Sequence, residues 1–331
     1  MENGKNLMQY KISKISGDAS FREFYKIEKN YKVTILVKAN KDKFRNLIVY
    51  AAINELLLKN KIRAPKLCQE YFDNNMMEIE YLGSVSFLRY IKNKKNKLKD
   101  YKKLIELIVK LQKINLKTKI KFKNNKIRIK KYNLSELHKE SNLFFDWYLK
   151  SIISKKEFKK NKNKIKKELN ILYKKLHFQE SCFVHRDFHA SNIMIKNNKF
   201  GVIDSQDALK GNLLYDVASL IDDVRIKLSQ KLKSTLLSYY LFKTKKIKNN
   251  KEKLIAKNDF DILSVQRNLK ILGIFVRLCK RDHKSIYLKY LPYIWKLLEL
   301  RLKNPIFINL KYLLDKAMPK KSRKKVNFNY D

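Results

Sequence analysis

Three polar side chains between residues 187 and 204 have the types and the spacing of a phosphoryl-transfer site. Asp187 follows His185 and Arg186, Asn192 comes five positions later, and Asp204 stands where the second of two short apolar runs ends. Phosphoryl transfer needs alignment and charge neutralisation rather than covalent help from the protein. One carboxylate takes the proton of an acceptor hydroxyl, while an Asn and a second Asp hold Mg²⁺, which prefers hard oxygen ligands. We therefore predict Asp187 as the catalytic base and Asn192 and Asp204 as metal ligands.

The neighbours of Asp187 are expected to support it. His185 and Arg186 are expected to brace the loop rather than to react. His189 either packs within the loop or faces the substrate. Asp216 precedes an apolar helical run, so its carboxylate either caps that helix or reaches back to hold the loop backbone.

The sequence around this loop predicts an α+β fold of the protein-kinase type with two lobes. Asn197-Asn198 favours a hairpin turn between strands at 192–195 and 200–203. Before the loop, a small N-terminal lobe would combine an antiparallel sheet with one helix. Its expected elements are strands over 21–28, 31–38, 66–71 and 76–81 and a helix over 43–59.

From residue 85 the apolar period becomes helical, which predicts a larger, mostly helical C-terminal lobe. Residues 117–131 form either a hairpin or a mobile loop, and 243–257 a charged linker. Trp147 lies in an aromatic cluster that is either core or a wall of the acceptor site. The predicted domains are residues 1–82, 83–318 and a poorly ordered basic tail over 319–331.

The N-terminal lobe carries the candidates for nucleotide binding. Gly17 and Ser20 lie where a flexible loop would cover the phosphates with backbone N–H groups. Lys38 closes an apolar strand, so it either reaches the phosphates and pairs with Glu55 of the next helix, or ends the strand in solvent. Near Glu80 and Leu82, the backbone between the lobes would pair with the adenine edge.

Composition restricts the class of protein further. The chain has 331 residues, 44% of them hydrophobic, and a formal charge of +46. Its lysines are spread along the chain among Asn, Ile and Tyr, as an AT-rich genome would encode, although a polyanionic partner is the alternative. The three cysteines are far apart, and no apolar run approaches the roughly 18–20 residues of a spanning helix. We expect a cytoplasmic, monomeric protein with no membrane partner and no specific nucleic-acid partner.

The loop sequence HRDFHASNIM resembles the catalytic loop of the aminoglycoside phosphotransferase-like kinases, with Asp204 in place of their metal-binding aspartate. Three longer segments, residues 16–27, 202–225 and 266–292, resemble the bacterial N-acetylmuramate/N-acetylglucosamine anomeric kinases. The resemblance implies ATP and Mg²⁺ as cofactors and phosphorylation of the C1 hydroxyl of cell-wall amino sugars in peptidoglycan recycling. It leaves open whether Lys38 or Arg22 neutralises the phosphates.

Two alternatives have different acceptors or none. The chain would phosphorylate another hydroxyl compound, such as an aminoglycoside, choline or homoserine, if its pocket were suited to a cation. Asp207, Asp222 and Asp223 are the carboxylates that could form such an acidic patch. Alternatively, the chain would be a basic nucleic-acid-binding protein with a decayed kinase fold.

Overall fold

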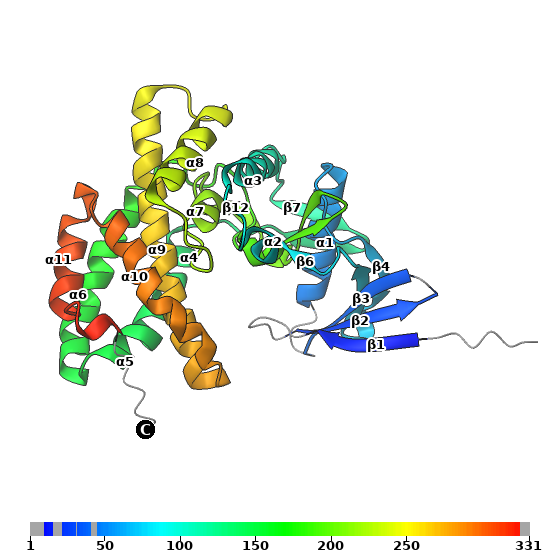
Figure 1. Cartoon of the computed structure of the whole chain (residues 1–331), viewed down its shortest axis with the longest axis horizontal. Helices are drawn as coiled ribbons and strands as arrows, with labels where there is room; N and C mark the ends of the chain where they lie inside the picture. Colours follow the sequence, from blue (N-terminus) through cyan, green and yellow to red (C-terminus); the bar gives the residue numbers. More distant parts are fainter. Residues whose placement is uncertain (1–9, 16–21, 31, 41–44, 325–331) are drawn as a thin grey trace, which may run out of the picture. The chain divides into compact units, whose positions relative to one another are not determined.

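The computed structural model describes residues 10–15, 22–30, 32–40 and 45–324 (Figure 1), so the candidates Gly17 and Ser20 lie outside the described residues. The chain divides into two compact units. The strand-rich unit contains the described parts of residues 1–94, 117–129 and 190–208. The helical unit contains those of residues 95–116, 130–189 and 209–331. The strand-rich unit therefore includes the hairpin after Asn192 in addition to most of the N-terminal segment that we predicted as a lobe.

An antiparallel sheet organises the strand-rich unit. Its strands are β1 (Tyr10–Ile15), β2 (Glu23–Lys29), β3 (Lys32–Lys38), β5 (Met76–Glu80) and β4 (Leu67–Tyr71), in that spatial order. Asn30 and Asn75 take the left-handed backbone conformation that the turns next to β3 and β5 require, with φ of 45° and 57°. Helix α1 (Arg45–Lys59) buries Leu47 and Ala51 with the inward side chains of the sheet, such as Val37. The predicted antiparallel sheet and its one long helix are confirmed.

Two hairpins complete this unit. Strands β10 (Ile193–Lys196) and β11 (Lys199–Val202) pair antiparallel across Asn197 and Asn198, whose φ values are 52° and 55°. Positive φ at both turn residues is the geometry of a two-residue hairpin and explains the Asn-Asn pair. Strand β6 (Val85–Ser86), which leads into α2 (Phe87–Ile91), pairs with the other edge of β10. The second hairpin, β7 (Lys119–Phe122) and β8 (Asn125–Arg128), decides the alternative left open for residues 117–131.

The helical unit is built around one long helix, α9 (Asn250–Asp282) (Figure 1). Helix α9 packs against α4 (Leu134–Leu143), α7 (Tyr215–Ile221), α10 (Leu291–Arg301) and a π-helical turn at Phe144–Leu149. A short ladder, β9 (Cys182–Val184) with β12 (Leu209–Gly211), carries the chain into the loop of Asp187. The helices are α3 (Leu98–Leu111), α4 (Leu134–Leu143), α5 (Lys150–Ile152), α6 (Lys155–Lys174), α7 (Tyr215–Ile221), α8 (Gln230–Lys243), α9, α10 (Leu291–Arg301) and α11 (Ile308–Ala317).

Two expectations for the helical unit are wrong. The segment 243–257 is not a linker from end to end, because α9 starts at Asn250 and is continuous to Asp282. Asn249 caps the helix by accepting a hydrogen bond from the N–H of Glu252 at 2.8 Å. The many lysines in the first turns of α9 are compatible with a helix because they need only a solvated face. The segment after residue 319 is not wholly unordered either. The Arg323 side chain is buried, donates to the carbonyl of Met318 at 2.9 Å, and lies over the Trp295 ring.

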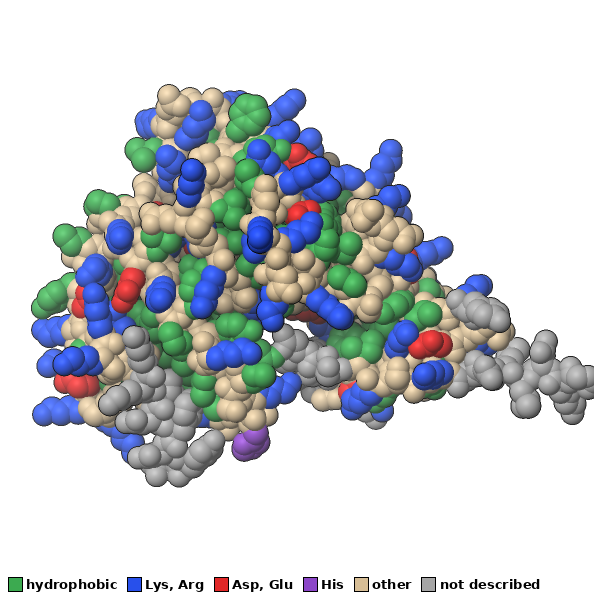
Figure 2. Space-filling view, in the orientation of Figure 1, with side chains coloured by type: hydrophobic (Ala, Val, Ile, Leu, Met, Phe, Trp, Pro, Cys, Tyr) green, Lys and Arg blue, Asp and Glu red, His purple; other side chains and the backbone are tan. Residues whose placement is uncertain are grey.

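Across the described parts of both units, none of the helices has the length and apolar character required to cross a bilayer. Lys and Arg side chains are scattered over the visible face in Figure 2 rather than gathered in one patch.

Candidate active site

The loop that carries Asp187 is held by the buried carboxylate of Asp216 at the start of α7. Asp216 accepts the backbone N–H of His185 at 2.7 Å and that of Arg186 at 3.0 Å. Of the two roles considered for Asp216, the structure therefore shows the one that fixes the loop backbone. Burial raises the pKa of the Asp216 carboxyl, and the nearby His185 and the two bonded N–H groups oppose that rise. The Asp187 side chain itself is half-buried.

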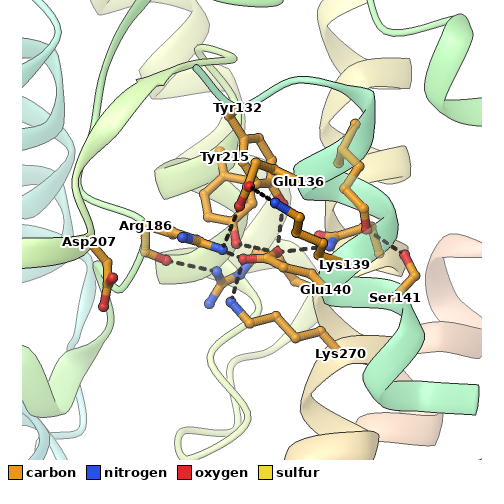
Figure 3. Close-up of polar contacts among 12 residues, drawn as sticks. Tyr132, Glu136, Lys139, Glu140, Ser141, Arg186, Asp207, Tyr215 and Lys270 are labelled. Carbon is orange, nitrogen blue, oxygen red and sulfur yellow. Dashed lines mark hydrogen bonds and ion pairs between the residues drawn. The ribbon is translucent and has the colours of Figure 1, made fainter. Parts of the chain in front are cut away.

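Arg186, next to Asp187, has a left-handed backbone with φ of 76°, which is uncommon for a residue with a long side chain. Its side chain donates from Nε to Glu140 Oε1 at 2.8 Å (Figure 3). Its carbonyl accepts from Nη1 of Arg267 at 3.0 Å. A strained conformation of this kind persists only where the surrounding contacts determine it.

The two histidines of the loop occupy different environments. The His185 ring is fully buried, and neither of its nitrogens has a hydrogen-bond partner among the described residues. It meets the Phe188 ring edge-to-face with centroids 6.0 Å apart, which is an aromatic packing contact. The backbone N–H of His189 donates to the carbonyl of Asp187 at 3.0 Å. Burial lowers the pKa of the His189 ring, which favours the neutral imidazole.

In the strand-rich unit, Arg22 forms an ion pair with Asp204. Arg22 Nη2 lies 2.5 Å from Asp204 Oδ1, and Nη1 donates to Gln206 Oε1 at 2.8 Å. The guanidinium is also 5.5 Å from the ring centroid of Tyr50, whose hydroxyl accepts the N–H of Asp204 at 3.2 Å. Burial raises the pKa of Tyr50 to about 12, so its hydroxyl stays protonated. Arg22, rather than Lys38, is thus the cation beside the candidate metal ligand.

Asn192 and Asp204 lie close along the backbone within this unit. The N–H of Ile203 donates to the carbonyl of Asn192 at 3.0 Å, which brings the end of β11 beside the short 3-10 turn at Ala190–Asn192. Asp204 has a left-handed backbone with φ of 66°, and its side chain is 35% exposed. Carboxylate and amide oxygens, the donors that Asp204 and Asn192 offer, are the ligands that Mg²⁺ prefers.

The structure does not bring Lys38 and Glu55 together. Lys38 is exposed opposite Glu23 on β2, and Glu55 pairs with Lys59 one turn further along α1. Among the described residues no ion pair joins Lys38 to Glu55, so the predicted pairing is absent from this structure. The kinase-type lysine–glutamate pair requires a lysine that points toward the helix, and this side chain points to solvent.

The remaining candidates lie on several elements. In the strand-rich unit, the N–H of Glu80 donates to the carbonyl of Lys66 at 2.8 Å, Leu82 is buried, and Asp207 is exposed. In the helical unit, Trp147 is half-buried in the π-helical turn. Asp222 is not available for an acidic patch, because its buried carboxylate accepts Lys233 Nζ at 2.6 Å and Arg301 Nε at 2.8 Å.

One polar centre was missed at the level of sequence. The carboxylate of Glu140, on α4, is 3% exposed and receives the side chains of residues from four other segments (Figure 3). Glu140 follows Leu137 by three positions and precedes Phe144 by four, so it lies on the apolar face of its helix. A charged residue on an apolar face was the available signal.

Comparison with solved structures identifies the class of fold. A choline kinase from Cryptosporidium parvum superposes with a TM-score of 0.61 at 11% identity, covering 94% of this chain and 95% of that one. An ADP-bound aminoglycoside phosphotransferase gives 0.58 at 16% identity, covering 89% and 94%. The chain therefore has the kinase-like fold that the sequence predicted.

Sequence comparison identifies the family. The profile of the phosphotransferase enzyme family matches residues 11–248, and the chain belongs to that family. The N-acetylmuramate/N-acetylglucosamine kinase of Pseudomonas aeruginosa is 25% identical over 288 residues, 86% of this chain and 81% of that protein. The kinase of the same name from Neisseria meningitidis is 25% identical over 283 residues, 84% and 81% of the two chains. The prediction of a phosphotransferase is confirmed.

Proposed function

We propose that this phosphotransferase moves the γ-phosphoryl group of ATP to the C1 hydroxyl of N-acetylmuramate and N-acetylglucosamine. Two relatives with this activity in their name match more than four-fifths of this chain. The structural observation that carries the proposal is the pair of hydrogen bonds that Asp216 accepts from the backbone N–H groups of the two residues before Asp187. Such a contact presents one carboxylate in a fixed place, as the reaction requires.

Asp187 acts as the general base in this proposal. Its carboxylate accepts a hydrogen bond from the C1 hydroxyl and takes the proton as the sugar oxygen bonds to the γ-phosphorus. The bond between that phosphorus and the oxygen bridging it to the β-phosphate breaks at the same time, and ADP leaves. The sugar 1-phosphate and ADP are the products. His189, Trp147 and Asp207 remain candidates for contacts with the sugar.

Asn192 and Asp204 would hold Mg²⁺, since both offer oxygen ligands and lie close along the backbone. The ion supplies charge neutralisation for the phosphates when it is bound. Arg22 would add a second positive charge beside Asp204, a role that its ion pair supports better than the exposed position of Lys38 does. Glu80 and Leu82 would contribute backbone groups to the adenine. Since the reaction consumes ATP, we infer a cytoplasmic location, and we expect a monomer in light scattering.

A panel of acceptors tests this proposal. We expect ADP release with Mg-ATP and either amino sugar, and none above background with an aminoglycoside, choline or homoserine. Turnover with only one of those three compounds would show that the protein is a kinase with a different acceptor. Absence of ATP binding, together with tight binding to mixed-sequence DNA at physiological salt, would favour the nucleic-acid alternative.

A further inference from the structure

The carboxylate of Glu140 accepts hydrogen bonds from four other segments of the helical unit, including the loop of Asp187 (Figure 3). Its Oε1 accepts from Arg186 Nε and Lys270 Nζ, both at 2.8 Å. Its Oε2 accepts from the other three donors: Tyr132 Oη at 2.5 Å, Tyr215 Oη at 3.0 Å and Gln266 Nε2 at 2.9 Å. With five donors on two oxygens, the carboxylate has no room for a substrate and cannot act in the chemistry directly.

Arg186 is the residue through which this centre contacts the loop of Asp187. Its N–H is bound by Asp216, its carbonyl by Arg267 and its side chain by Glu140. These contacts, together with a longer ion pair from Nη2 to Glu136 Oε2 at 3.6 Å, fix the residue that precedes Asp187 in its left-handed backbone conformation. Without the Glu140 contact, the side chain would keep only the longer ion pair with Glu136, and the two backbone contacts would have to hold most of the strained conformation.

Charge is essential to the centre. Burial opposes ionisation of Glu140, but the positive charges of Lys270 and Arg186 outweigh it and lower the pKa of the carboxyl well below its ordinary value. A glutamine side chain would keep the shape and remove the charge that both cations face. The two tyrosine hydroxyls can rotate to accept from an amide, so the loss would fall on Arg186 and Lys270.

Helix α9 supplies one side of the centre. Its side chains come from a part of the chain in which phosphoryl-transfer chemistry by itself requires no particular residue. Gln266 and Lys270 are one helical turn apart, and both reach Glu140. Three residues further on, a Cβ placed on Gly273 would lie 2.1 Å from the carbonyl oxygen of Leu143, in the last turn of α4. The absence of that Cβ lets α9 approach α4 closely enough for the two side chains to reach the carboxylate.

We propose that Glu140 is a positioning residue: through Arg186 it holds the backbone before Asp187 in the conformation required for phosphoryl transfer. The role rests on the proposed function, since it gives Asp187 the part of the base. The effect on turnover follows from geometry, because a displacement of about 1 Å at a reacting group costs up to about a hundredfold in rate.

Glu140→Gln is the test, with Asp222→Asn as the matched control. Asp222 is also a buried carboxylate of the helical unit that faces two cations, Lys233 and Arg301, but it does not contact the loop. We expect both variants to melt below the wild type. Only Glu140→Gln should lower kcat, by about 10- to 100-fold per folded molecule, with the KM for ATP within about twofold of wild type.

Hydrogen exchange of residues 182–188 supplies a readout that does not depend on turnover. The amides of His185 and Arg186 should exchange faster in Glu140→Gln than in Asp222→Asn at equal distance from the melting temperature. Equal exchange, or an unchanged kcat in Glu140→Gln, would overturn the positioning role. If the wild type turns over no sugar, the proposed function fails, while the exchange comparison still decides whether Glu140 holds the loop. Should Glu140→Gln not fold, Lys270→Met and Lys270→Arg replace it, and only the arginine should restore slow exchange.

Discussion

Gly273 offers a test in which two physical effects predict opposite signs for the change in stability caused by Gly273→Ala. Alanine in the interior of a helix is favoured over glycine by about 1 kcal/mol, so helix propensity alone predicts that Gly273→Ala stabilises the protein. The added Cβ would meet three backbone atoms, Leu143 O at 2.1 Å, Leu143 C at 2.2 Å and Phe144 N at 2.6 Å. Backbone atoms cannot turn aside as the end of a side chain can, so α9 or the π-helical turn must shift.

The clash should outweigh the gain in helix propensity. Overpacking of a tight core costs about 1–3 kcal/mol, and a contact against backbone belongs at or above the upper end of that range. Subtracting the gain of about 1 kcal/mol in propensity leaves a net loss of about 2 kcal/mol or more in the free energy of unfolding. Urea unfolding followed by far-UV circular dichroism measures it. The shift of α9 should also reduce kcat, because it withdraws Lys270 from Glu140.

Gly201→Ala is the matched control for this measurement. At Gly201 the nearest atom to an added Cβ is Leu82 Cδ1 at 2.8 Å, the flexible end of a side chain, so the cost should stay below about 1 kcal/mol. The reasoning about the α9–α4 contact would be refuted if Gly273→Ala were as stable as the wild type, or more stable.

Other substitutions probe separate contacts. Burial opposes ionisation of Asp222, but Lys233 and Arg301 lower the pKa of its carboxyl well below the ordinary value. The stability that the ionised carboxylate contributes is therefore present above about pH 4 and is lost on acidification. In urea titrations, the free energy of unfolding of the wild type should fall more steeply between about pH 5 and pH 2 than that of Asp222→Asn. Arg22→Gln should raise the KM for ATP about tenfold or more, the loss of roughly 1.4 kcal/mol, whereas Lys38→Gln should leave it within about twofold; equal effects in initial-rate assays would contradict the assignment of the phosphate-side cation. Asp216→Asn should lower kcat more than it alters the KM for ATP, because an amide accepts through one oxygen where the carboxylate accepts through two; an unchanged kcat would argue against its hold on the loop.

Much of the fold could be predicted because the signals were local. Asn197 and Asn198 specify a turn by their own backbone preferences, and the apolar alternation of β3 predicts its buried face without knowledge of its neighbours. The start of α9 was not predicted. Its first two turns contain many lysines and little apolar periodicity, and only the Asn249 cap marks the boundary.

The residues of the candidate site were likewise only partly predictable from the sequence. The spacing of Asp187, Asn192 and Asp204 could be read directly, since these residues lie within one stretch of the chain. The role of Glu140 could not, because all of its partners except Tyr132 lie 46 to 130 residues away and meet it only in the folded unit. A sequence shows the type of such a side chain but not whether its charge is buried against two cations or solvated.

The assignment of the base is tested most directly by one comparison, wild type against Asp187→Asn, with Mg-ATP and N-acetylmuramate. ADP release should fall by about 10²–10⁴-fold in the variant, the usual contribution of a general base, with an unchanged melting curve. The wild-type product should carry its phosphate on C1 in the NMR spectrum. Turnover by Asp187→Asn at the wild-type rate, or phosphate on another hydroxyl of the sugar, would contradict the proposed reaction.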